Sequence, residues 1–65
     1  MREKVNTAQT LGENAAAAIN DAEEQSFEYT DGYHDLKAAA ASYALAAVLC
    51  SRAAEILASA AQEDK

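Results

Sequence analysis

Residues 20–35 read NDAEEQSFEYTDGYHD, and this segment decides how the chain on either side of it folds. Asp31 and Gly32, with Ser26 and Thr30 close by, are typical of a turn, because aspartate bonds nearby backbone amides and glycine accepts backbone angles that other residues avoid. The flanking sequence is rich in alanine, which has the highest helix propensity. We therefore expect a turn between two helices. A single unbroken helix is the alternative, because the chain contains no proline.

Residues 3–25 show the apolar spacing of a helix that buries one stripe. Two capping-box patterns compete for the start of this helix: Asn6 with Gln9, and Thr10 with Glu13. Gly12 follows the second pattern and costs about 1 kcal/mol relative to alanine in a helix interior. The apolar stripe consists of Val5, Ala8, Leu11, Ala15, Ala18, Ile19 and Ala22.

Residues 33–62 are expected to form the second helix, and their apolar side chains fall on two faces. One face, named here the Tyr43 seam, keeps a strict seven-residue repeat. On this seam we expect Tyr43 in the core and Cys50 packed as a small apolar side chain. The seam consists of Leu36, Ala40, Tyr43, Ala47, Cys50, Ala54, Leu57 and Ala61.

The other face of the second helix, named here the partner face, consists of Leu45, Val48, Leu49 and Ile56. The first helix can cover only one of the two faces. Soluble monomers rarely leave a large apolar face in water, so the second face is expected to bind another copy of the chain or another protein. The sequence thus predicts a homo-oligomer or a hetero-complex.

The predicted fold class is all-α, a two-helix hairpin formed by residues 3–25 and 33–62 within a single domain of residues 1–65. Eighteen residues are alanine, and large apolar side chains are few. A core made mostly of methyl groups offsets chain entropy poorly, since burial stabilises by only about 25 cal/mol per Å². The hairpin is therefore expected to be completed by dimerisation or by a partner.

The formal net charge of −6 restricts the partners. A chain this acidic is repelled by nucleic acid and by anionic membranes, and it is attracted to basic protein surfaces. No stretch approaches the about 20 uninterrupted apolar residues of a membrane span. The single cysteine, Cys50, excludes an intramolecular disulfide. We expect a cytoplasmic protein that binds neither nucleic acid nor a membrane directly.

The acidic turn region is the candidate interaction site. Its carboxylates carry one sign of charge with no lysine or arginine between Lys4 and Lys37, and its tyrosines are of the type that protein interfaces enrich. A solvated acidic surface that supplies caps for the helix ends is the alternative. The candidate residues are Asp21, Glu23, Glu24, Glu28, Tyr29, Asp31, Tyr33 and Asp35.

Neither a metal site nor an enzyme is predicted. Asp31, His34 and Asp35 are spaced closely enough to suggest metal ligands, but no second histidine is present and the spacing of a calcium-binding loop is not met. His34 is read instead as a surface or capping residue. The sequence has no glycine-rich phosphate loop, and Cys50 lies more than four helical turns from His34 on the same predicted helix. We expect no catalytic residues and no cofactor.

The run LKAAAASYA at residues 36–44 resembles a stretch of small helical proteins of bacteriophages and prophages, in which Leu-Ala-x-Ala-Ala-x-x-Tyr-Ala follows an acidic turn. The chain departs from that pattern at Lys37, which replaces an alanine, and in the distances of Gly32 and His34 from the run. The resemblance implies a phage accessory protein that acts in a bacterial host, of the kind that includes anti-CRISPR inhibitors. The matching residues are Leu36, Ala39, Ala40, Tyr43 and Ala44.

Two functions follow as expectations. The first is a non-enzymatic protein-binding module, a phage-type inhibitor whose acidic surface mimics nucleic acid and occupies a basic site of a nucleic-acid-handling protein of the host. The second is a structural subunit of a self-assembling helical bundle, a homodimer or tetramer without an inhibitory role, in which the acidic residues only confer solubility.

Overall fold

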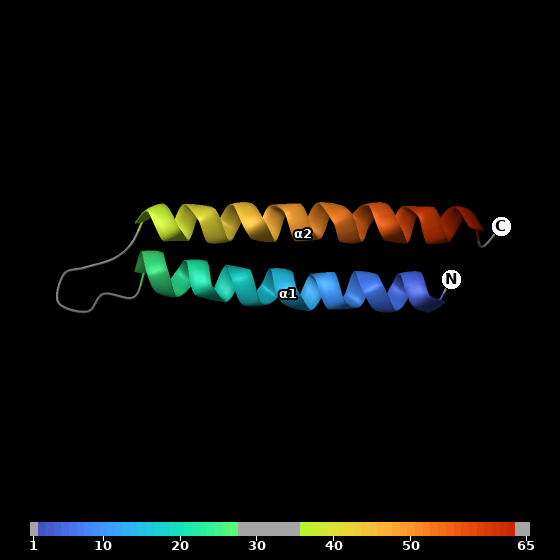
Figure 1. Ribbon diagram of the computed structural model, residues 1–65, viewed down its shortest axis with the longest axis horizontal. Helices are drawn as coiled ribbons and strands as arrows, with labels where there is room; N and C mark the ends of the chain where they lie inside the picture. Colours follow the sequence, from blue (N-terminus) through green and yellow to red (C-terminus); the bar gives the residue numbers. More distant parts are fainter. Residues whose placement is uncertain (1, 28–35, 64–65) are drawn as a thin grey trace.

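Two long antiparallel helices form the protein in the computed structural model, which describes residues 2–27 and 36–63. Helix α1 spans Arg2–Phe27 and helix α2 spans Leu36–Glu63. The two helices lie side by side, and both chain termini are at the same end of the molecule (Figure 1). The structure confirms the all-α hairpin and excludes the single unbroken helix. Of the predicted turn residues, Thr30, Asp31 and Gly32 lie outside the described residues. Ser26 lies within α1, where its hydroxyl donates a hydrogen bond to the carbonyl oxygen of Ala22 at 2.7 Å, so its assignment to the turn was wrong.

Helix α1 begins earlier than either capping box predicted. The Thr7 hydroxyl donates a hydrogen bond to the carbonyl oxygen of Glu3 at 2.9 Å, and the Thr10 hydroxyl donates to the carbonyl oxygen of Asn6 at 3.1 Å. Bonds from a threonine to the carbonyl four residues earlier occur inside helices. Thr10 and Asn6 are therefore interior residues of α1, and the prediction that one of them caps the helix was wrong.

Alanines at a seven-residue interval form the buried side of α1. Ala8, Ala15 and Ala22 are at most 4% exposed, and Ala18 is buried between them. Leu11 and Val5 are half-buried at the edge of this side. The predicted apolar stripe of the first helix is confirmed, except that Ile19 is exposed.

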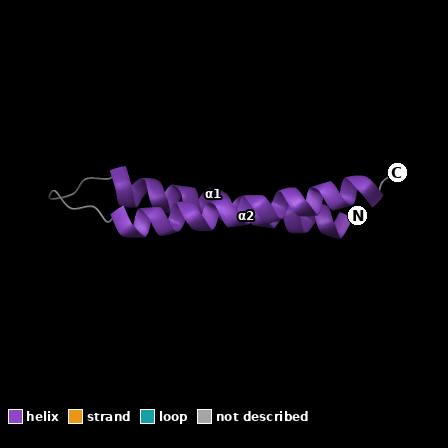
Figure 2. Ribbon diagram, turned by 90° about the horizontal axis from the view of Figure 1, so that it is seen from above, coloured by secondary structure: helices purple, strands orange, loops and turns teal. Residues whose placement is uncertain are grey.

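Helix α2 meets α1 with its own alanines at the same interval. Ala39, Ala46 and Ala60 are buried, and Ala53 is half-buried between them. Leu49 packs against the buried cluster of Ala15, Ala18 and Ala46. A strict seven-residue repeat on two packed helices imposes a gradual supercoil, and the two ribbons cross near their middle in the view from above (Figure 2). We name these alanines of both helices, buried except for the half-buried Ala53, the alanine core: Ala8, Ala15, Ala18, Ala22, Ala39, Ala46, Ala53 and Ala60.

The hairpin is a rod with a thin core. Among the described residues, no side chain larger than alanine is buried. The molecule extends 55 × 14 × 11 Å, and its radius of gyration of 15.2 Å exceeds the about 11 Å of a compact domain of this length. Its accessible surface of 4820 Å² likewise exceeds the about 4000 Å² expected of a compact 6.8 kDa monomer. Much apolar surface therefore remains in water.

Polar contacts fix the register of the helices at both ends of the alanine core. The Lys4 ammonium forms an ion pair with Glu63 and donates to the Ser59 hydroxyl at 3.0 Å. At the other end, the half-buried Gln25 amide hydrogen-bonds the Ser42 hydroxyl at 2.9 Å. With its nitrogen facing the nearby acceptors, the same amide donates to the carbonyl oxygen of Ala38 at 3.1 Å.

These two sets of contacts lie at equivalent positions of the seven-residue repeat. Lys4 and Gln25 are three heptads apart on α1, and Glu63 and Ser42 are three heptads apart on α2. Any shift of one helix along the other removes both sets of contacts together, so they select one register of an otherwise uniform alanine interface.

Gly12 is a weak point of α1 that a substitution is expected to repair. A Cβ atom at this position meets nothing within 4 Å, so Gly12→Ala gains helix propensity without a clash. We expect the free energy of unfolding in urea to rise by about 1 kcal/mol. As the converse control, Ala16→Gly at an exposed position one turn later should lower it by a similar amount. An unchanged or lowered stability of Gly12→Ala would show that α1 is not helical at this position.

Candidate interaction surface

Helix α1 packs between the two apolar faces predicted for α2, and this leaves the Tyr43 seam in water. Leu36 is 62% exposed, Leu57 is 47% exposed and Tyr43 is 41% exposed. The Cys50 thiol is exposed as well. The prediction that Tyr43 and Cys50 lie in the core was therefore wrong. Alanine side chains allow two helix axes to approach more closely than a tyrosine does, and α1 accordingly follows the alanine series next to this seam.

The partner face predicted from the sequence is divided by the same packing. Leu45 and Val48 are 53% and 55% exposed, so they are available to another molecule. Leu49 instead packs against the alanine core, and Ile56 is half-buried beside α1. Only Leu45 and Val48 of the predicted set thus form an open surface.

The hairpin has two sides along which the surfaces of α1 and α2 meet, named here its flanks, and a groove marks one of them. The groove has a volume of about 370 Å³ and lies between the first turns of α1 and the last turns of α2. Its lining includes Thr7 and Ser59, which each precede a buried alanine by one residue. On both helices, the residue directly before each alanine of the Ala8 series and of the Ala60 series therefore lies on this flank. The groove residues are Glu3, Lys4, Thr7, Glu55, Ile56 and Ser59.

The heptad repeat places Asp21 beside Leu45 on this flank. Asp21 lies two heptads after Thr7 on α1, and Leu45 lies two heptads before Ser59 on α2. Because the helices are antiparallel, Asp21 and Leu45 are related to each other as Thr7 is to Ser59. The exposed residues Glu24 and Val48 follow Asp21 and Leu45 by three residues, so each lies beside its neighbour on the same helix and farther from the helix interface. We name Asp21, Glu24, Leu45 and Val48 the acidic flank.

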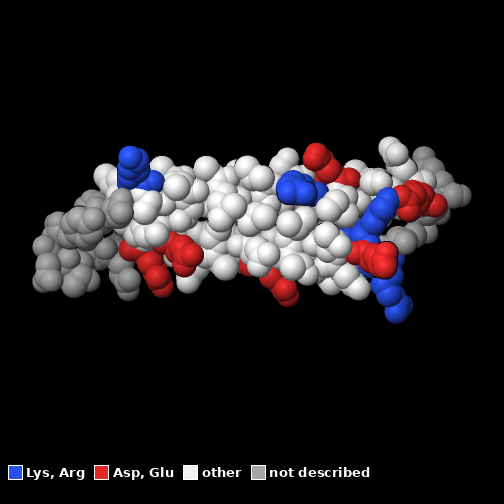
Figure 3. Space-filling view, in the orientation of Figure 1, with Lys and Arg blue, Asp and Glu red and all other residues white. Residues whose placement is uncertain are grey.

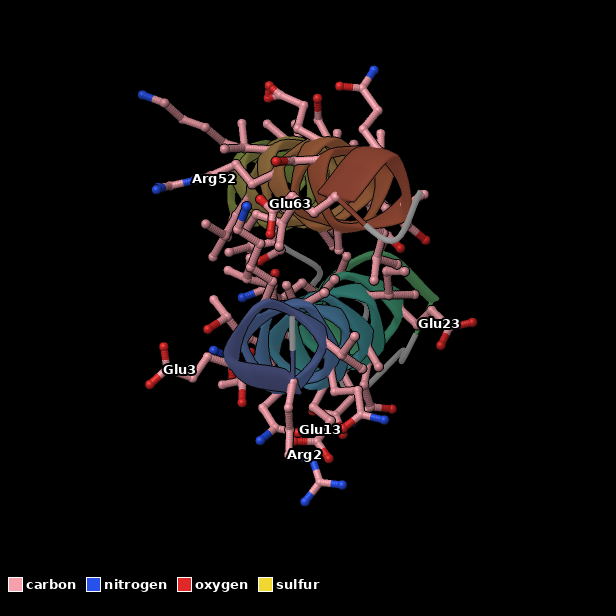
Figure 4. The ribbon with its side chains drawn as sticks, turned by 90° about the vertical axis from the view of Figure 1, so that its right-hand side faces the viewer. Arg2, Glu3, Glu13, Glu23, Arg52 and Glu63 are labelled. Atoms are coloured by element: carbon pink, nitrogen blue, oxygen red, sulfur yellow. The ribbon has the colours of Figure 1, made fainter. Side chains whose placement is uncertain are left out.

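Only part of the predicted acidic site lies in the described residues. Asp21, Glu23 and Glu24 are all exposed in the last turns of α1. Glu23 points away from the side of the hairpin that carries Arg52, so it does not belong to the acidic flank (Figure 4). The remaining predicted residues lie outside the described residues: Glu28, Tyr29, Asp31, Tyr33 and Asp35.

The charges at the two ends of the rod differ. Within residues 2–27 and 36–63, the one ion pair joins Lys4 to Glu63 at the end where the termini meet. The last turn of α1 carries no basic residue. In the space-filling view, blue and red side chains lie together at the terminal end, whereas near the other end red ones gather on α1 and a blue one lies on α2 (Figure 3). The carboxylates of Asp21 and Glu24 are thus exposed and without a basic neighbour of their own helix.

The residues of the acidic flank on α2 were not recognised as neighbours of the acids from the sequence. Leu45 and Asp21 are far apart in the chain, and their proximity depends on the register of the two helices. The available signal was the seven-residue alanine series on each helix, which relates the two positions once the helices are aligned.

A metal site and a membrane span are two further possibilities for the described part of the chain. No group of three histidine, cysteine or acidic side chains able to hold a metal ion occurs in residues 2–27 and 36–63. The metal ligands considered from the sequence, Asp31, His34 and Asp35, lie outside these residues. Helix α2 is long and apolar enough to cross a membrane by length and composition. The core helix of a soluble protein meets the same criterion, but such a helix is mostly buried, whereas most of α2 is exposed in the hairpin.

Comparison with known proteins gave no relative: no protein family, no characterised protein and no solved structure matches this chain.

Proposed function

We propose that this protein is a non-enzymatic binding module whose acidic flank docks on a basic site of another protein. The observation that carries the proposal is the asymmetry of charge along the rod. At the terminal end Lys4 and Glu63 form an ion pair, whereas Asp21 and Glu24 near the other end are exposed and lack a basic neighbour on α1. The local excess of negative charge at this end of α1 attracts a partner of opposite charge and speeds its association.

Exposed apolar side chains beside the carboxylates support a contact that goes beyond steering. Leu45 and Val48 are more than half exposed on the same flank as Asp21 and Glu24. Protein interfaces combine an apolar centre with a charged rim, and the apolar part supplies most of the binding free energy. The acidic flank has both components.

A basic site of a nucleic-acid-handling protein is the partner that we propose. Such sites present lysine and arginine side chains to phosphates, and a rigid helix with carboxylates on one flank offers them negative charge without a nucleic acid. The resemblance of residues 36–44 to small phage proteins adds that this partner belongs to a bacterial host. In this proposal the protein inhibits its partner by occupying the nucleic-acid site.

The test uses the immobilised chain to capture proteins from a bacterial lysate, with elution by a salt gradient. Captured proteins are then assayed for binding to a labelled DNA duplex in the presence of the free chain. We expect the chain to compete with the duplex, and Asp21→Asn with Glu24→Gln to weaken that competition roughly tenfold, since two interface charges are removed.

A matched control removes the same number of charges elsewhere. Glu13 and Glu23 are exposed but lie off the acidic flank, so Glu13→Gln with Glu23→Gln should leave the competition nearly unchanged. If the two double variants lost the same amount of competition, the effect would come from net charge alone and not from the acidic flank. Competition that does not respond to salt, or captured proteins that still bind DNA fully, would refute the proposal.

A further inference from the structure

We propose that the Tyr43 seam of α2 binds the Tyr43 seam of a second copy of this chain, with the two α2 helices antiparallel and related by a twofold axis near Cys50. This seam lies away from the acidic flank, and the inference does not depend on the proposed function.

The Tyr43 seam repeats the pattern by which α2 already recognises a helix. In the alanine core, α2 places Ala39, Ala46, Ala53 and Ala60 at every seventh position, with larger side chains such as Leu49 between them. The Tyr43 seam places exposed alanines one residue later, at every seventh position, with Leu36, Tyr43, Cys50 and Leu57 between them. A second helix therefore fits this seam by the same alternation of small and large side chains.

The seam is nearly symmetric about Cys50, and this selects a second copy as the occupant. In a twofold antiparallel pair centred on Cys50, a residue that precedes Cys50 faces one that follows it by the same number. Tyr43 and Leu57 are each seven residues from Cys50 and so face each other. Ala47 precedes Cys50 by three residues and Ala54 follows it by four, so the two alanines are one residue, or about 1.5 Å, out of register and lie close to each other across the pair. Cys50 faces its own copy.

The flank beside the seam is compatible with this contact. On α1, Val5 and Ile19 come directly after Lys4 and Ala18, which face α2. On α2, Tyr43 and Leu57 come directly after Ser42 and Ile56, which face α1. Val5, Ile19, Tyr43 and Leu57 therefore lie on the same flank of the antiparallel hairpin. The residues of the Tyr43 seam include no charge, so pairing two copies buries no unpaired ion.

The rod as a whole has surface to spare for an interface of standard size. The chain exposes 4820 Å², about 800 Å² more than a compact monomer of this mass, and a standard stable interface buries about 800 Å² per partner. An alanine core alone leaves the single hairpin with little apolar burial. Pairing through the seam supplies the burial that the separate hairpin lacks.

The first experiment measures mass in solution by light scattering, with helix content measured by circular dichroism. We expect twice the mass of one 6.8 kDa chain for the natural protein. Ala47→Glu places a charge in the seam and should yield the mass of a single chain. Ala41→Glu makes the same change at an exposed position on the other side of α2 and should retain the double mass. A single-chain mass for the natural protein, or equal masses for the two variants, would overturn the proposal.

The second experiment tests the arrangement of the two helices. On a Cys50→Ser background, chains with Tyr43→Cys and chains with Leu57→Cys are mixed and treated with diamide, which takes up one hydrogen from each of two thiols as the disulfide forms. Antiparallel pairing predicts cross-links mainly between a chain of one kind and a chain of the other. Cross-links mainly between chains of the same kind would contradict it, because a parallel pair places each residue beside itself.

A lipid surface is the competing occupant of an exposed apolar helix, and the same variants distinguish it. One outcome would show that the seam binds a membrane and not a second copy: the natural chain binds phosphatidylcholine vesicles, Ala47→Glu does not, and the natural chain has a single-chain mass in buffer. No vesicle binding together with the double mass supports the pairing of two copies.

Discussion

Ala46→Leu is expected to destabilise the hairpin by about 1–3 kcal/mol, because the core at this position has no room for three more carbon atoms. Ala46 is 4% exposed and packs in one cluster with Ala15 and Ala18. A leucine there forces the helix axes apart, which weakens the alanine contacts on both sides. For a chain of this length the total stability is about 3–10 kcal/mol, so the loss is a large part of it.

Urea unfolding followed by circular dichroism, at one fixed chain concentration, measures this loss. Ala41→Leu is the matched control, since Ala41 is exposed on α2 and its substitution should change the stability by less than about 0.5 kcal/mol. A gain in stability of Ala46→Leu would show that the helices separate freely. In that case the close approach of alanines does not hold the hairpin together.

Leu49→Asp is expected to lower the free energy of unfolding by about 2–3 kcal/mol, since it removes apolar contact and places a carboxylate against an apolar core. Leu49 is the large side chain that packs on the cluster of Ala15, Ala18 and Ala46. Its predicted neighbour on the partner face, Leu45, is 53% exposed, and Leu45→Asp should have little effect on stability.

The contrast between these two variants separates the observed packing from the face predicted by the sequence. If Leu45 and Leu49 lay on one open face, the two substitutions would have similar, small effects. If α1 covered that whole face, both would be strongly destabilising. A large effect of Leu49→Asp alone agrees with α1 packing beside the alanines between the two faces.

The hairpin and the buried stripe of α1 could be predicted from the sequence, because the polar residues of that helix leave only one apolar side. Helix α2 was ambiguous for a physical reason. Its alanines recur every seven residues in two adjacent series, one containing Ala46 and the other containing Ala47. Periodicity predicts two such series but does not choose between them, and the large side chains Tyr43 and Leu57 favoured the wrong one.

The choice between the series depends on how closely the helices approach. Where both helices present alanine, the axes come together and polar pairs such as Gln25 with Ser42 form across the interface. That distance is a property of two helices together, and a pattern along one helix does not contain it. For the same reason the acids of α1 could be recognised from composition, but their position beside Leu45 could not.

The reactivity of the Cys50 thiol tests the central claim, which is that α2 has one seam that closes the hairpin and a second that is open in the single chain. The measurement is the rate of reaction of native protein with a chromogenic aromatic disulfide over a wide range of chain concentrations. We predict a rate close to that of a free thiol at low concentration, because Cys50 is exposed on the hairpin, and a falling rate as two seams pair at high concentration. A slow reaction at concentrations where the mass is that of a single chain would place Cys50 inside the hairpin. A fast reaction at every concentration would show that the seam does not pair. Either result contradicts the account.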